Sequence, residues 1–196
     1  MVSGTGSVSL EIKGCAFHWS QAVWRRVVDV GLAETYQRRT GVHSFIRQIL
    51  SLQFLPSSHI RRAFDALQGQ ATTDATQRLV EYVERQWIHS SVFPVESWSV
   101  FRQTVRTNND VEGWHHRLNS KAGNMGLQFY RLVPLLQTEA DDVKMAIRAG
   151  DLGRNMRGRS KTLEKSLSSI WDQYEEGNIT TSKFLKRCGE LYGVRV

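Results

Sequence analysis

Apolar residues recur at spacings of three and four along most of this chain, which places them on one face of a helix. The first segment with this spacing covers residues 17–32, and the second covers residues 42–53. Two more follow, within residues 60–67 and 79–87, and turn-forming residues separate them. The spacing therefore predicts a mainly α-helical protein whose core lies between several amphipathic helices.

The second half of the chain continues the helical pattern. Polar residues precede a predicted helix at about residues 109–119, and a longer helix is predicted over residues 127–149. The tail, residues 162–196, predicts two short helices with a break at Gly177 and Asn178. We expect six to eight helices in all.

A different pattern precedes the first helix. Val8, Leu10 and Ile12 alternate with polar residues, which predicts one short N-terminal strand. The segment 151–161 contains two glycines, few large apolar residues and a basic run, as a linker would. We therefore expect a multi-helix bundle with one short N-terminal strand. The expected parts are a tail and strand (1–13), a helical domain (14–150), a basic linker (151–161) and a C-terminal helical pair (162–196).

Charge and cysteine content narrow the class of protein. The net charge of +7 and the isoelectric point near 9.7 favour polyanionic partners such as nucleic acid. Cys15 and Cys188 are too few for a disulfide framework, which fits a reducing compartment. No apolar run is long enough to span a membrane, and the first residues do not resemble a signal peptide. We expect a soluble intracellular protein without a membrane partner.

Glu112 stands in the stretch RTNNDVEGWHHRLN, residues 106–119. With Asn109 as the N-cap, Glu112 occupies the third helical position, where a capping-box glutamate accepts a hydrogen bond from the cap's own N–H. The alternative is a metal-binding carboxylate. Catalytic Mg²⁺ needs several oxygen ligands, so this alternative requires partner acids from elsewhere in the fold.

Two segments resemble a known family. The pattern TNNxxEGWHxxLN, residues 107–119, resembles the segment that carries the last acidic residue in transposases of Mutator-like elements (MULEs). Upstream, residues 14–21 read GCAFHWSQ and are similar to the CxxH segment of the same family. Residues 31–36 and Trp98 continue the likeness, which extends from about Ile12 to Asn119.

The resemblance implies a ribonuclease H-like core with a catalytic triad of two aspartates and a glutamate, and it places Glu112 at the glutamate. The chain would correspond to the helical insertion and the closing helices of that core. The two aspartates would precede Cys15, but the fourteen residues before Cys15 contain no aspartate. We therefore expect a truncated or domesticated transposase fragment that is catalytically silent and located in the nucleus.

The resemblance also bears on cofactors and on supporting residues. No cofactor is expected for the chain alone, and Mg²⁺ would bind only if a partner chain with the missing core supplied the aspartates. Cys15 and His18 would share a face of a helix and could bind one metal ion, but the further ligands of a zinc site are missing from the sequence. The alternative is a buried thiol beside Phe17 and a hydrogen-bonded histidine. With Trp114, we predict that Cys15 and His18 support the core and bind no metal.

Basic residues are the candidates for nucleic-acid contact. They could hold a phosphate backbone without reading its sequence, although ordinary solvated charge also explains each pair. The candidates are Arg25, Arg26, Arg61, Arg62, Arg154, Arg157, Arg159 and Lys161.

Three functions remain open at this point. The chain could be a silent transposase remnant with non-specific DNA binding, or a fragment that completes a metal-dependent nuclease site in trans. It could also be a helical protein-interaction module without a nucleic-acid role. The six tryptophans could stack on bases, but their aliphatic neighbours at helical spacing favour core packing.

Overall fold

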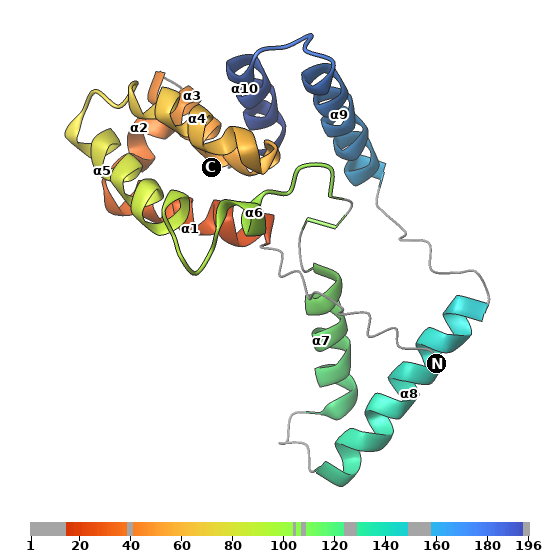
Figure 1. Cartoon of the computed structure of the whole chain (residues 1–196). Coiled ribbons are helices and arrows are strands. Elements are labelled where there is room, and N and C mark those ends of the chain that lie inside the picture. Colours follow the sequence, from red (N-terminus) through yellow and green to blue (C-terminus); the bar gives the residue numbers. More distant parts are fainter. Residues whose placement is uncertain are drawn as a thin grey trace, which may run out of the picture. The chain divides into compact units, whose positions relative to one another are not determined.

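The computed structural model describes residues 15–38, 41–103, 105–106, 109–123, 129–148 and 158–193. Every regular element within these ranges is a helix, which confirms the prediction of a mainly α-helical protein (Figure 1). The contacts divide the chain into two compact units. We call Met1–Arg106 with Leu163–Val196 the main unit, and Thr107–Thr162 the inserted unit. The predicted N-terminal strand lies outside the described residues.

The main unit contains all but two of the helices in the described ranges, and the first and last parts of the chain build it together. Its elements are α1 (Ala16–Asp29), α2 (Ala33–Gln37), α3 (Gly41–Leu50), the 3₁₀ turn η1 (Ser51–Phe54), α4 (Ser57–Gln68), α5 (Asp74–Val83), the π-helical turn η2 (Glu84–Ile88), α6 (Val95–Trp98), most of α9 (Gly158–Glu175) and α10 (Thr181–Tyr192). The inserted unit contains α7 (Asn109–Ala122) and α8 (Phe129–Arg148).

These contacts group the chain differently from the expected parts. The C-terminal pair, α9 and α10, belongs with the N-terminal helices, and α10 packs chiefly against α3 and η1 (Figure 1). The helix α9 begins at Gly158, so the last residues of the segment expected to be a linker are helical. Two short helices, α2 and α6, were not predicted, because four or five residues are too few to show a helical period.

Threonine side chains cap the N-terminal ends of α5 and α10. The sequence offers Thr73 or Asp74 as the cap of α5, and the Thr73 hydroxyl takes this role by accepting a hydrogen bond from Thr76 N. For α10 it offers Thr180 or Thr181, and Thr180 is the cap, with its hydroxyl accepting a hydrogen bond from Lys183 N.

At α4 the sequence offers Ser57 and Ser58 as caps, and this prediction is wrong because both serines lie within the helix. Pro56 holds the cap position there and makes no side-chain cap hydrogen bond. Its fixed backbone angle leads the chain into the helix instead.

Aromatic rings fill part of the main core. The Trp19 and Trp98 rings stack with centroids 4.4 Å apart, and Trp87 meets Trp19 edge-on at 5.0 Å. Trp171 is buried and donates its Nε1–H to the Phe54 carbonyl at 2.9 Å. Trp24 packs against the edge of this core. The prediction that most tryptophans pack in the core is confirmed.

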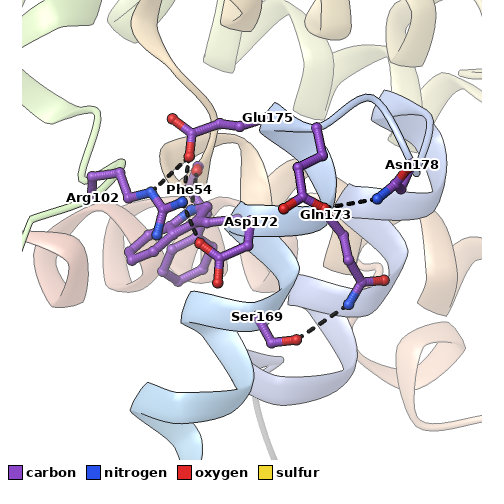
Figure 2. Close-up of polar contacts among 9 residues, drawn as sticks. Phe54, Arg102, Ser169, Asp172, Gln173, Glu175 and Asn178 are labelled. Carbon is purple, nitrogen blue, oxygen red and sulfur yellow. Dashed lines mark hydrogen bonds and ion pairs between the residues drawn. The ribbon is translucent and has the colours of Figure 1, made fainter.

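The side chain of Arg102, which follows α6 in the chain, contacts α9. Its guanidinium forms ion pairs with Asp172 and Glu175 (Figure 2). The guanidinium carbon also lies 5.8 Å from the centre of the Trp171 ring. Its φ of 57° is in the left-handed region, which residues other than glycine seldom adopt. Three favourable contacts of one side chain therefore hold a backbone conformation that is costly on its own.

Candidate nucleic-acid interface

Arg61 and Arg62 lie on the outer side of α4. The buried stripe of this helix consists of Ile60, Ala63, Phe64 and Leu67, at spacings of three and four. Both arginine side chains are exposed, because their positions fall between the members of that stripe. The structure therefore places this predicted pair on the surface of a well-packed helix.

The two arginines have different surroundings, since neighbouring residues on a helix point about 100° apart. Arg61 Nη1 lies 3.4 Å from His89 Nδ1, and His89 Nε2 lies 3.7 Å from Glu84 Oε1. Gln68 donates to the other Glu84 oxygen at 3.2 Å. Arg62 instead lines a pocket in which no acidic residue takes part.

The arginines of α1 also differ from each other. Arg25 is exposed, whereas Arg26 is half-buried with its guanidinium carbon 5.7 Å from the centre of the Tyr82 ring. This distance is typical of a cation–π contact, so Arg26 helps to hold α1 against α5. Of the predicted pair, Arg25 is the better placed for a partner outside the protein.

Some arginines of the main unit form ion pairs with acids, and others do not. In the main unit, acids pair with Arg38, Arg78, Arg102 and Arg106. Within the described residues, no acid pairs with Arg25, Arg61 or Arg62. These three exposed arginines therefore carry positive charge that the described part of the chain does not compensate.

The third predicted basic cluster is described in part. Arg154 and Arg157 lie outside the described residues, and so does the side chain of Arg159, which stands in the first turn of α9. Lys161 is exposed on the same helix.

Glu112 is exposed near the start of α7. The residues expected to cap this helix, Thr107 and Asn108, lie outside the described residues, as does the Asn109 side chain. The acids of the neighbouring helix α8 gather elsewhere. Asp142 Oδ2 lies 3.5 Å from Lys121 Nζ, and Lys121 stands nine positions after Glu112, which is about 13 Å along a helix.

Glu139 ties α7 to α8. This buried carboxylate accepts hydrogen bonds from Lys121 Nζ at 2.5 Å and from Arg117 Nε and Nη2 at 3.4 Å. The hydrogen bond from Lys121, together with the charges of Lys121 and Arg117, outweighs desolvation and holds the pKa of Glu139 below its ordinary value. Arg117, Lys121 and Glu139 thus hold the two helices of the inserted unit together.

The residues predicted to support the core lie nearer the surface than expected. Cys15 is half-buried at the N-cap of α1, His18 is exposed with its ring centroid 5.7 Å from that of Phe17, and Trp114 is half-buried. Across the described ranges, no three His, Cys, Asp or Glu side chains come together as metal ligands would.

Sequence reasoning missed a pocket of about 540 Å³ between α4 and α10. A chain of hydrogen bonds runs along its wall, from His59 Nδ1 to Tyr174 Oη at 2.9 Å and from Tyr174 Oη to Thr181 Oγ1 at 3.1 Å. His59 and Tyr174 are 115 positions apart, so no local spacing in the sequence indicates this arrangement.

Comparison of the chain with models of protein families, with characterised proteins and with solved structures gives no match in any of the three. In the part of the chain that the structure describes, no helix combines the length and apolar character needed to cross a membrane.

Proposed function

We propose that this protein is a remnant of a MULE-like transposase that binds the phosphate backbone of nucleic acid without reading its sequence. The observation that carries the binding proposal is the set of exposed arginines without an acidic partner, above all Arg25 and Arg61. Arginine is well suited to phosphate contacts, which fix the position of a protein on a duplex without selecting bases. The lineage rests on the two ordered motifs, around Cys15 and around Glu112.

The proposal includes no phosphodiester chemistry. The resemblance supplies a single acid, Glu112, whereas metal-assisted cleavage uses several carboxylates around one or two divalent ions. Mg²⁺-dependent cleavage would need the two aspartates of the transposase core in addition to Glu112.

The test is a fluorescence-anisotropy titration of labelled DNA duplexes of unrelated sequence, at 50 mM and 200 mM salt. We expect similar affinity for each sequence and a steep loss of affinity with salt, because binding to phosphates releases counterions. The double variant Arg25→Gln/Arg61→Gln should lower the salt slope by about two, at roughly 0.9 for each lost phosphate contact.

The matched control is Arg38→Gln/Arg78→Gln. It removes the same charge from two exposed arginines that already pair with Glu34 and Asp74. The control should lose much less affinity than the test variant. Equal losses in the two variants would show that net charge, and not these arginines, governs binding. Absence of binding at 50 mM salt would disprove the proposal.

A second candidate function is a helical protein-interaction module, and one observation favours it. The helix α8 exposes large apolar side chains, including Phe129 and Tyr130 near its start and Met145 and Ile147 near its end. Contacts through such residues would depend little on salt, because burial of apolar surface and not charge would drive them. Salt-insensitive self-association in light scattering, without DNA binding, would favour this candidate.

A further inference from the structure

The pocket between α4 and α10 has the size and the lining of a small-molecule site. Its volume of about 540 Å³ lies within the range typical of ligand pockets. One part of the lining is apolar, formed by Ala63, Ala66, Leu67 and Leu185. Such a lining would accept a hydrocarbon body and release the water around it.

The rest of the lining is polar and lacks acids. Arg62 is its one permanently charged residue, and hydroxyl groups of Ser58, Thr181 and Ser182 also line the pocket. A guanidinium offers several N–H donors in a fixed plane and pairs well with a carboxylate or a phosphate. Because no lining acid neutralises Arg62, its charge remains available to a ligand.

Side chains from three helices fix the pocket wall before any ligand binds. The Tyr174 hydroxyl of α9 bridges His59 of α4 and Thr181 of α10, and its ring packs 4.6 Å from the ring of Phe184. The two hydrogen bonds of the Tyr174 hydroxyl hold its side chain and those of His59 and Thr181 in place along the pocket wall. A wall that is already ordered loses little freedom when a ligand binds.

We propose that this pocket binds a small organic anion that has an apolar body and one carboxylate or phosphate group. The anionic group pairs with Arg62, and the body rests on Ala63, Ala66 and Leu67. A cationic ligand is disfavoured because Arg62 would repel it and no lining acid would attract it. This inference does not depend on nucleic-acid binding, whose test leaves Arg62 unchanged.

The test is a titration of the ¹⁵N-labelled full chain with 4-phenylbutyrate, phenyl phosphate and the neutral 4-phenylbutyramide, followed by NMR. We expect the anions to bind at least about tenfold more tightly than the amide, the ratio that one charge-assisted pair supports. The shifted amide signals should belong to residues 58–70 and 174–185. 4-Phenylbutyrate and its amide share one body, so their comparison tests the charge, and phenyl phosphate tests whether the pocket also accepts a phosphate.

Two variants and one control locate the site. Arg62→Gln should weaken both anions about tenfold and leave the amide unchanged. Ala66→Trp, at an exposed position that lines the pocket, should abolish binding of all three probes by filling the space. Arg61→Gln, one position away and outside the lining, should leave the affinity for all three probes unchanged. The proposal fails if no probe binds at millimolar concentration, or if Ala66→Trp or Arg62→Gln leaves anion binding intact.

Discussion

Arg106 and Glu164 form a two-armed ion pair that joins the two points where the main unit gives way to the inserted unit. Arg106 Nη1 donates to Glu164 Oε2 at 2.8 Å, and Nη2 donates to Oε1 and, at 3.2 Å, to the Tyr192 hydroxyl. Only 8% of the Arg106 side chain is exposed. Burial opposes its charge, but the interactions with Glu164 and Tyr192 together outweigh burial, so the pKa of Arg106 is raised.

The first prediction concerns this pair. Glu164→Gln leaves a buried guanidinium without its counter-charge, which should reduce the free energy of unfolding by about 1–3 kcal/mol. The measurement is urea denaturation followed by tryptophan fluorescence, which reports on the main core. Glu34→Gln, which breaks the exposed pair with Arg38, should cost less than about 0.5 kcal/mol. Similar costs for both variants would show that burial of the Arg106 pair contributes nothing.

The second prediction uses the left-handed backbone of Arg102. Arg102→Gly and Arg102→Ala both remove the ion pairs with Asp172 and Glu175, so their difference isolates the backbone. The glycine variant should be more stable by about 1 kcal/mol, because glycine adopts a positive φ without a steric cost. Thermal unfolding of the two variants measures this difference. An alanine variant as stable as the glycine variant would indicate that the turn relaxes once the side chain is gone.

The third prediction contrasts two glycines within helices. A Cβ at Gly189 of α10 would lie 3.0 Å from Arg47 Cβ and 3.2 Å from the Arg47 carbonyl oxygen, whereas a Cβ at Gly113 of α7 would meet nothing within 4 Å. Gly113→Ala should stabilise its helix by about 0.5–1 kcal/mol. Gly189→Ala should cost about 1 kcal/mol, because the added methyl group separates α10 from α3. Chemical denaturation monitored by circular dichroism tests both, and a stabilising Gly189→Ala would contradict the close approach.

The fourth prediction concerns the two thiols. Cys188 is buried, and burial raises the pKa of its thiol, so little of the reactive thiolate forms. Cys15 is half-buried. A disulfide reagent should modify Cys15 quickly and Cys188 at least about a hundredfold more slowly, until the protein unfolds. Cys15→Ser should remove the fast phase, and a fast phase that survives in this variant would contradict the burial of Cys188.

The fifth prediction is a pH dependence. The pKa of Glu139 is lowered from its ordinary 4.5, so its stabilising effect is complete above pH 4.5 and disappears as the pH falls through the lower folded value. Helix signals from α7 and α8 should therefore weaken in acid. Glu139→Gln should already be weakened at pH 7 and change little on acidification, as measured by NMR between pH 3 and pH 7. Equal acid sensitivity of the variant would assign the effect to another group.

Local patterns in the sequence predicted much of this fold. The spacing of apolar residues located the long helices, since the same spacing buries Trp19, Val23 and Val27 on one face of α1. Cap residues located two helix starts to within one residue, at Thr73 or Asp74 and at Thr180 or Thr181, because such side chains satisfy an amide that the helix leaves without a partner. The sequence predicts six to eight helices. The described residues also contain α2 and α6, which no sequence pattern indicates because each is shorter than two turns.

The features that require contacts between distant parts of the chain could not be predicted. Arg102 meets Asp172 across 70 positions, and His59 meets Tyr174 across 115. Such partners share no period or local motif, and only the packing of helices brings them together. For the same reason no local pattern indicates that Arg62 lines a pocket while Arg61, its neighbour, contacts His89.

The position of α10 has a consequence for synthesis of the protein on the ribosome. Arg47 of α3 donates a hydrogen bond to the Glu190 carbonyl of α10, 143 positions later in the chain. At about 5–20 residues per second, translation leaves roughly 7 to 29 s between these two residues. During that interval the nascent chain exposes the apolar faces of α3 and η1 that α10 will cover. We therefore expect chaperones to bind this uncovered apolar surface.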